Sequence, residues 1–188
     1  MNFRTTALDG VIIVEPDVHR DARGFFLETY HAEKYAKGGI DADFVQHNHS
    51  RSVRGTLRGL HAQWRRPQGK LVRCLQGEIF DVAADMRIGS PTRCTWVGVT
   101  LSSENHHQIY VPPGYLHAFV VLSEIAEVEY KCTDLYDPGY ELGIRWDDPE
   151  IGVEWPIDPS DVLLSAKDRD APFLADAPRE HLPTWTPR

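Results

Sequence analysis

The chain has 188 residues, of which 41% are hydrophobic and 26% are charged, proportions that are ordinary for a globular domain. A chain of this length buries roughly 70% of its unfolded surface, so its core needs no disulfide or metal. The formal net charge of -8 argues against a general binder of nucleic acids or anionic membranes. Any anionic ligand must therefore be held by a local cluster of positive side chains.

Cysteine usage and the absence of an apolar leader indicate the compartment. The three cysteines, Cys74, Cys94 and Cys132, form neither a disulfide framework nor a C-x-x-C motif, which is typical of a reducing compartment. The first ten residues contain no apolar run of signal-peptide length, and no stretch is long enough to cross a bilayer. We therefore expect a cytoplasmic protein.

The first elements along the chain are short. Residues 11–14 are β-branched and predict a strand. Residues 31–37 predict a helix, because Gly38 and Gly39 are placed to end it. Residues 44–46 favour extended backbone.

From residue 56 to residue 136 the pattern has mostly period two and is divided by turn sequences at 67–69, 89–91 and 112–114. Many short strands at a spacing of about ten residues are typical of a sandwich or barrel and not of alternating βαβ units. The sequence therefore predicts an all-β fold with a few short helices.

The C-terminal part no longer follows the period-two pattern. Ser165 is placed to cap a short helix. We expect residues 1–174 to form a single domain, and the Pro-rich residues 175–188 to form a poorly ordered C-terminal tail.

Strand parity indicates which polar side chains point inward. Tyr130 and Cys132 share the apolar face of their strand, so the phenol is expected inside. His61 and Gln63 share one face, whereas Arg58 has the other parity unless a bulge intervenes. Phenol and imidazole groups inside a barrel are unusual for a plain core.

Two stretches have the spacing of cupin motifs. The first cupin motif is a glycine, five residues, H-x-H, a short gap, a glutamate, six residues and a glycine. The chain matches this spacing with Gly55, His61, Gln63, Lys70 and Gly77. The second motif contains P-x-G-x-x-H, which residues 112–117 match. The chain thus resembles the cupin superfamily and predicts its antiparallel β-barrel, a jelly roll.

Two positions that carry metal ligands in that motif have changed. Gln63 replaces a histidine, and Lys70 replaces the carboxylate. Because divalent transition metals require imidazole and carboxylate ligands and a lysine ammonium repels the ion, we expect no metal and no other cofactor. The glutamate-to-lysine change turns a cation site into an anion site.

A longer resemblance covers about residues 8 to 172. It is carried by ordered blocks that include GFFLETY (24–30), TLRGLHAQ (56–63), VPPGYLHAFVVLSE (111–124), AEVEYKCTDLYDP (126–138) and LSAKDRDAP (164–172). These blocks resemble the dTDP-4-dehydrorhamnose 3,5-epimerase family. The resemblance implies a metal-free homodimeric isomerase that converts dTDP-4-keto-6-deoxyglucose to dTDP-4-keto-rhamnose, with that nucleotide sugar as its partner and neither nucleic acid nor membrane.

The resemblance also implies roles for individual residues. His61 corresponds to the general base, Asp168 to its carboxylate partner, Tyr130 to the general acid on the opposite sugar face, and Lys70 to the group near the 4-keto oxygen. The positions implied to line the substrate and nucleotide site are Arg23, Glu28, Gln46, Asn48, Arg58, His117, Glu141 and Lys167.

These residue types suit the chemistry. A hydrogen next to a ketone is acidic because its carbanion delocalises into an enolate, so the reaction needs a base, a group that stabilises the oxyanion and an acid on the other face. Histidine, with an ordinary pKa of about 6.5, can act as the base at neutral pH. A carboxylate such as Asp168 orients the ring and stabilises the imidazolium.

Each residue also has a structural interpretation. Asp168 can belong to a capping box with Ser165, and Tyr130 can be an ordinary core tyrosine. Three positions depart from the family pattern: Ala62 stands where an aromatic is usual, His47 where an aspartate is usual and Ala118 where a glycine is usual. They leave open whether one carbon or both are epimerised.

Other classes of function remain as alternatives. One is an epimerase acting at a single carbon of a related nucleotide-linked sugar. Another is a metal-dependent cupin oxygenase or isomerase, against which Gln63 and Lys70 argue. A third is a cupin that binds the nucleotide sugar without catalysis.

Overall fold

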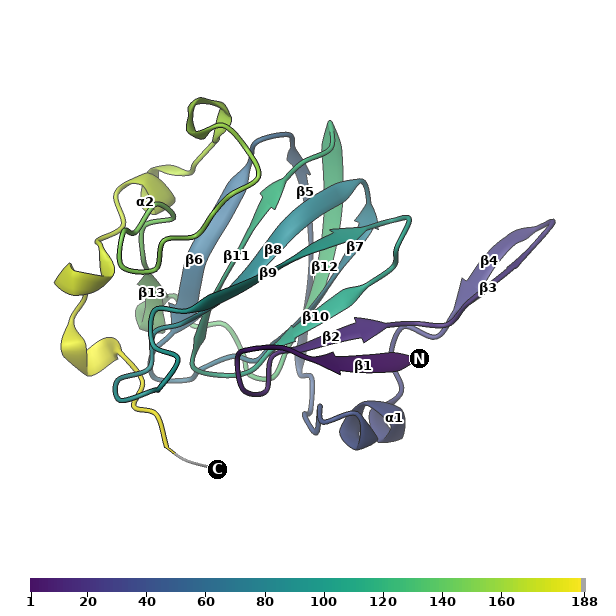
Figure 1. Ribbon diagram of the computed structural model, residues 1–188, viewed down its shortest axis with the longest axis horizontal. Coiled ribbons are helices and arrows are strands. Elements are labelled where there is room, and N and C mark those ends of the chain that lie inside the picture. The colour runs from purple at the N-terminus through teal and green to yellow at the C-terminus, as the bar shows by residue number, and fades with distance from the viewer. Residues whose placement is uncertain (187–188) are drawn as a thin grey trace.

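The computed structural model describes residues 1–186. Two antiparallel sheets form its body (Figure 1). The six-stranded sheet has the order β1 (Asn2–Thr5), β2 (Ile12–Glu15), β10 (Gln108–Val111), β7 (Lys70–Gln76), β12 (Ile125–Cys132) and β5 (Gln46–Val53). The five-stranded sheet has the order β13 (Glu141–Gly143), β6 (Leu57–Gln63), β11 (Tyr115–Val121), β8 (Glu78–Asp85) and β9 (Trp96–Ser102). The prediction of an all-β, cupin-type barrel is confirmed.

The remaining elements are short. The helices are α1 (Ala32–Lys37) and α2 (Ala166–Arg169), and four 3-10 turns cover Pro138–Tyr140, Pro159–Asp161, Leu174–Asp176 and Arg179–His181. The strands β3 (Val18–Asp21) and β4 (Gly24–Leu27) form a hairpin that projects away from the barrel (Figure 1). The predicted strand at 11–14 and helix at 31–37 are both confirmed. No helix within residues 1–186 is long and apolar enough to span a membrane.

The main core lies between the two sheets. Alternate residues of each strand point inward, so Val72 and Val128 of one sheet pack against Ile79, Ala83 and Phe119 of the other. Burying a side chain of this size contributes about 1.5–3 kcal/mol. The same alternation places polar residues inside at one end of the barrel, where the apolar packing stops.

The outer face of the five-stranded sheet is also buried. Leu60 and Leu116 point outward from it and pack against Leu142, Ile151 and Leu174 of the chain after β12. This C-terminal segment wraps around the sheet (Figure 1), and it brings α2 next to β6.

The expectation of a poorly ordered tail is wrong for residues 175–186. Leu182 is 9% exposed and belongs to the cluster on the outer sheet face. The Trp185 amide donates to the Ile88 carbonyl at 2.9 Å, and Thr184 forms a bridge with Ile88. The tail is held because its apolar residues cover a hydrophobic face, which its proline content does not reveal. Residues 187–188 lie outside the described part, and the domain boundary at 174 stays a prediction.

Candidate active site

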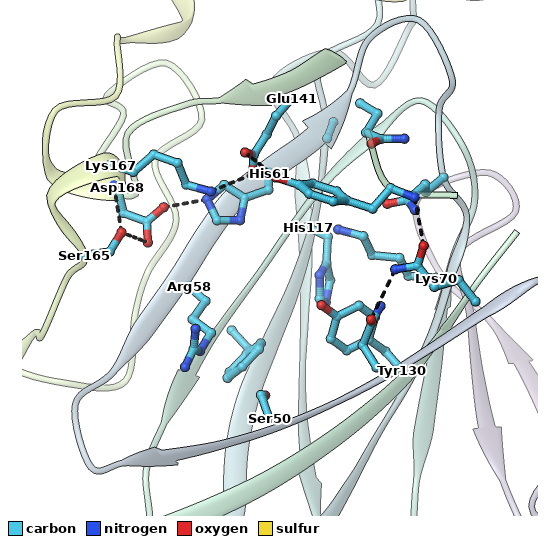
Figure 2. A pocket seen from close by; sticks show the side chains of 17 residues that line it. Ser50, Arg58, His61, Lys70, His117, Tyr130, Glu141, Ser165, Lys167 and Asp168 are labelled. Carbon is cyan, nitrogen blue, oxygen red and sulfur yellow. Dashed lines mark hydrogen bonds and ion pairs between the residues drawn. The ribbon is translucent and has the colours of Figure 1, made fainter. Parts of the chain in front are cut away.

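A cavity of about 530 Å³ lies inside the barrel at the end where the inward residues are polar (Figure 2). Ten of the twelve predicted site residues line it: His61, Tyr130, Asp168, Lys70, Gln46, Asn48, Arg58, His117, Glu141 and Lys167. Most of the residues that the family resemblance implies therefore share one contiguous cavity.

Arg23 and Glu28 do not line this cavity. Arg23 lies near the tip of the β3–β4 hairpin, where its side chain is 90% exposed and pairs with Asp21. Glu28 follows β4 and pairs with Lys34 at 2.7 Å. Within a single chain, these two predicted binding residues are separate from the others.

An irregularity in β6 places Arg58 on the cavity wall together with His61. On β11, His117 pairs with His61, but Phe119 pairs with Arg58, so the register shifts between them. Gly59 lies in the irregular stretch with a φ of 123°, and a Cβ there would come within 2.4 Å of the Ala118 side chain. A bulge of this kind re-aims side chains, and a residue larger than glycine does not fit it.

His61 and Asp168 form a close pair at the cavity wall. His61 Nε2 lies 2.5 Å from Asp168 Oδ1, and the pair joins β6 to α2 (Figure 2). Ser165 caps α2: its hydroxyl accepts from the Asp168 amide and donates to Asp168 Oδ2 at 2.8 Å. Asp168 therefore serves both the helix cap and the histidine, and the two interpretations made from the sequence are compatible.

The charge on Asp168 is stabilised by its neighbours. Burial raises the pKa of Asp168, but the hydrogen bonds from His61 and Ser165 outweigh this effect and leave the pKa below its usual value. An ionised Asp168 accepts the Nε2 hydrogen of His61. Nδ1 is then the basic nitrogen, and it makes no hydrogen bond with any of the described residues 1–186.

Lys70 and Tyr130 come from the opposite sheet. Lys70 pairs with Cys132 across β7 and β12, which makes Lys70 and Tyr130 diagonal neighbours on one face. Within residues 1–186, neither the ammonium nor the phenol has a hydrogen-bond partner. A ligand in the cavity thus lies between His61 on one wall and Tyr130 with Lys70 on the other (Figure 2).

Burial moves the pKa values of these two groups in opposite directions. It lowers the pKa of Lys70, an effect that Cys132 and Asp81 partly oppose, and it raises the pKa of Tyr130. Removal from water disfavours the charged form of either group. Lys70 is accordingly a stronger acid than usual and Tyr130 keeps its proton to higher pH, so both present hydrogens to the cavity.

Lys167 and Glu141 form an ion pair at one side of the cavity. Lys167 Nζ lies 2.6 Å from Glu141 Oε1, and the Tyr136 hydroxyl donates to Glu141 Oε2 at 3.1 Å. Burial raises the pKa of Glu141, but the hydrogen bond from Lys167 and the charge of His61 outweigh it and lower the pKa overall.

The sequence analysis missed several residues of the wall. Ser50, Gln68, Phe119, Tyr136 and Ser165 also line the cavity. The parity of Gln46 and Asn48 along β5 was sufficient to find Ser50, whose buried hydroxyl has no partner among residues 1–186. Tyr136 lies in a loop, where no period reveals a direction.

Gln63 stands at a metal-ligand position of the cupin motif, and its side chain has a structural role instead. Its amide donates to the carbonyls of Arg66 and Leu135 and accepts from the Asp137 amide at 2.6 Å. The side chain thus fixes two loops at the rim of the cavity. Among residues 1–186, no group of three or more His, Cys, Asp or Glu side chains is placed to hold a metal ion.

The arrangement is that of an isomerase site within a cupin-type barrel: a base on one wall, a proton donor opposite and a cation beside it. Such a set can move protons at carbons next to a carbonyl.

The comparisons with known proteins agree with this class. The family model for dTDP-4-dehydrorhamnose 3,5-epimerase matches residues 5–176. The dTDP-4-dehydrorhamnose 3,5-epimerase of Pseudomonas aeruginosa is 52% identical over 178 residues, covering 94% of this chain and 98% of the relative. A crystal structure of dTDP-6-deoxy-D-glucose-3,5-epimerase from Legionella pneumophila, in complex with dTDP-4-keto-L-rhamnose, has 47% identity and a TM-score of 0.95, covering 99% of each chain. A dTDP-4-dehydrorhamnose 3-epimerase from Streptomyces niveus is 38% identical over 179 residues, covering 94% of this chain and 86% of the relative.

The chain belongs to the dTDP-4-dehydrorhamnose 3,5-epimerase family. The resemblance drawn from the sequence is therefore confirmed.

Proposed function

We propose that the protein inverts carbons 3 and 5 of dTDP-4-keto-6-deoxy-D-glucose and so produces dTDP-4-keto-L-rhamnose. The observation that carries the proposal is the placement of His61 Nδ1 and the Tyr130 hydroxyl, both unpartnered within residues 1–186, on opposite walls of one cavity. Inversion at a carbon requires proton removal from one face and proton delivery to the other. A base and an acid from two facing sheets meet this requirement.

In the proposed mechanism, His61 Nδ1 takes the hydrogen from the carbon next to the ketone, and the electron pair moves into the enolate. The Asp168 carboxylate, 2.5 Å from Nε2, stabilises the imidazolium that forms. Tyr130 then donates its proton to the same carbon from the opposite face. The carbon is inverted, and His61 loses a proton to solvent while Tyr130 regains one.

Lys70 stabilises the enolate oxygen. Its ammonium has no acceptor within residues 1–186, so it is available to the carbonyl oxygen as negative charge develops there. Because burial lowers the pKa of Lys70, the hydrogen bond to the oxyanion is stronger than that from a solvated lysine. Donors of this kind contribute about 10²–10³ in rate.

The nucleotide part lies toward Arg58. Its guanidinium donates to the Ser52 hydroxyl at 3.0 Å, which leaves other N–H groups free for the diphosphate. Bidentate pairing of guanidinium with phosphate gives both strength and geometry. Gln46 and Asn48 line the cavity from β5.

Deuterium wash-in tests this function. The protein is incubated with dTDP-4-keto-6-deoxyglucose in heavy water, and carbons 3 and 5 are followed by proton NMR. We expect deuterium at both carbons and its loss in His61→Ala, whereas Tyr130→Phe exchanges without full inversion. His181→Ala is the matched control, since His181 stacks on Trp64 outside the cavity.

Other results of the experiment point to the alternatives. Exchange at a single carbon would establish a mono-epimerase, the activity named for the relative from Streptomyces niveus. Tight binding without exchange would leave a sugar-nucleotide binder.

We also propose that the protein is a cytoplasmic homodimer in which the β3–β4 hairpin reaches the cavity of the partner. Three observations support this arrangement: Arg23 is 90% exposed, Phe25 and Phe26 are 56% and 71% exposed, and the hairpin points away from its own barrel (Figure 1). Free cysteines agree with a reducing compartment.

Mixing two inactive variants tests the exchange of hairpins. In a hybrid dimer of Arg23→Ala and His61→Ala, one cavity receives both intact residues if Arg23 acts across the interface. Half of the dimers in an equal mixture are hybrids with one intact site each, so about one quarter of wild-type activity returns. No recovery, with hybrids verified by mass, would place Arg23 in its own subunit's site.

A further inference from the structure

A second histidine–carboxylate pair faces the same cavity. His117 lies directly opposite His61 in the pairing of β11 with β6. His117 Nε2 is 2.9 Å and 3.0 Å from the two carboxylate oxygens of Asp81. Asp81 is on β8, diagonal to His117 on the inward face. The family resemblance points to His117 as a cavity residue, but it assigns no role to Asp81.

Asp81 is placed to act only through His117. Its side chain is 0% exposed, and both of its hydrogen bonds come from the His117 ring. Asp81 does not line the cavity, whereas His117 does. Removing one partner of a buried pair is strongly destabilising, so Asp81 depends on the His117 ring.

The direction of the hydrogen bond defines the chemistry of the other ring nitrogen. When Asp81 is ionised its carboxylate only accepts, so Nε2 of His117 carries the hydrogen. Nδ1 has no hydrogen-bond partner among residues 1–186, and it is not among the polar atoms that are fully buried without one. Since His117 lines the cavity, Nδ1 is open to it. The choice between a lone pair and an N–H at Nδ1 depends on the charge of the ring.

Groups from both sheets act on the Asp81 carboxylate. The groups that act on the Asp81 carboxylate are His117 and the Lys70 ammonium, which faces it from the other sheet. A neutral ring with Nε2 protonated leaves a lone pair on Nδ1.

We propose that Asp81 is a positioning residue that fixes His117 in the Nε2–H tautomer, so that Nδ1 accepts a hydrogen bond from a sugar hydroxyl next to the reacting carbons. The inference rests on the proposed epimerase function, because it assigns a task within that reaction. No proton is transferred at His117. The ring orients the sugar, and the adjacent His61 removes the hydrogen.

A double-mutant cycle with Asp81→Asn and His117→Gln tests the proposal. Each single variant is expected to lose about 10- to 100-fold in kcat/KM, since a buried hydrogen-bonding group is left unpaired. The double variant is expected to lose no more than His117→Gln alone, because Asp81 acts through the ring. Additive losses would overturn the proposal.

Nitrogen-15 NMR of the histidine rings supplies a readout that does not depend on activity. We expect the neutral Nε2–H tautomer for His117 in the wild type and a mixture of tautomers in Asp81→Asn. An imidazolium in the wild type at pH 7 would overturn the assignment of Nδ1 as an acceptor. If the wild type exchanges no hydrogen at either carbon, the proposed function fails, and the tautomer still decides the role of Asp81.

Asp85→Asn is the matched control. Asp85 lies on the same strand and is equally buried, but it binds Arg87, Ser90 and Thr92 outside the cavity. We expect this variant to lower the free energy of unfolding while kcat/KM of the folded enzyme and the His117 tautomer stay the same. If Asp85→Asn changes the tautomer as much as Asp81→Asn does, general loosening of the barrel explains the effect and the proposal fails.

Discussion

The pair His61–Asp168 and the pair His117–Asp81 contain the same two residue types and face the same cavity from adjacent strands. Their carboxylates come from different places. Asp168 is on α2, outside the barrel, and Ser165 also donates to it. Asp81 is on a central strand, and its hydrogen bonds come from the one ring.

The pKa values follow from this difference. The pKa of Asp168 is lowered, since its donors outweigh the burial that raises it. Burial raises the pKa of Asp81, and His117 and Lys70 do not compensate for it. A carboxylate with several donors can stabilise a new positive charge on its histidine, whereas one that is buried under a ring holds that ring in place. Under the proposed mechanism, the same pair serves as a base in one position and as a fixed acceptor in the other.

The largest expected effect comes from Asp168→Asn, which removes the negative charge that pairs with His61, the proposed base. We expect kcat to fall by about 10³–10⁴, because the imidazolium is no longer stabilised and the ring tautomer is no longer enforced. Steady-state kinetics checks this value. A loss below tenfold would mean that the two carboxylates do not have different roles.

A smaller effect is expected for His117→Gln. We expect kcat/KM to fall by about 10- to 100-fold, while deuterium still enters at both carbons. His61→Gln, the matched change on the neighbouring strand, should abolish the wash-in. Loss of exchange in His117→Gln would make His117 a second base.

The loss of activity at alkaline pH is expected to follow the deprotonation of Lys70. Burial lowers the pKa of Lys70 and raises the pKa of Tyr130, and both groups must be protonated to act. These opposite shifts favour loss of the Lys70 proton before that of Tyr130 as the pH rises, and activity is then expected to fall. The arginine of Lys70→Arg keeps its charge at higher pH, so the fall in kcat should shift to higher pH. A fall that does not shift would be assigned to Tyr130.

The smallest effects concern stability in acid. A lowered pKa means that ionised Asp168 stabilises the fold above the unfolded pKa of about 3.9, and this contribution is lost as the pH falls through the folded pKa. Asp81 has a raised pKa, so its contribution is present below that value and is lost as the pH rises. Each unit of pKa shift corresponds to about 1.4 kcal/mol.

Urea unfolding between pH 3 and pH 7 separates these two contributions. In Asp168→Asn, the free energy of unfolding should rise less steeply with pH than in the wild type. In Asp81→Asn, the part of that free energy that falls with rising pH should be absent. The same slope in both variants would show that the carboxylates have equivalent environments.

Part of the cavity was predictable from the spacing of residues on strands, and its other predicted residues were implied by the family resemblance. The interval from Gly55 to Gly77 locates His61 and Lys70, and parity along β12 correctly orients Tyr130. The position of Arg58 depended on a bulge that the sequence left open, because parity alone cannot reveal an inserted residue.

Other features depend on contacts between distant segments. Asp81 is one acid in an apolar strand, and its partner His117 lies 36 residues later. Residues 175–186 pack on the apolar outer face of the five-stranded sheet, and this face forms only when the strands assemble. Local composition does not encode either relationship.

The distance along the chain between the base and its carboxylate has a consequence for synthesis. His61 and Asp168 are 107 residues apart, and a ribosome adds about 5–20 residues per second. For about 5–20 s the nascent chain carries His61 without its carboxylate, while Asp81 and His117 emerge much earlier. Chains released before α2 lack the carboxylate that pairs with His61 even when the barrel strands are complete, so under the proposed mechanism their proton transfer is impaired.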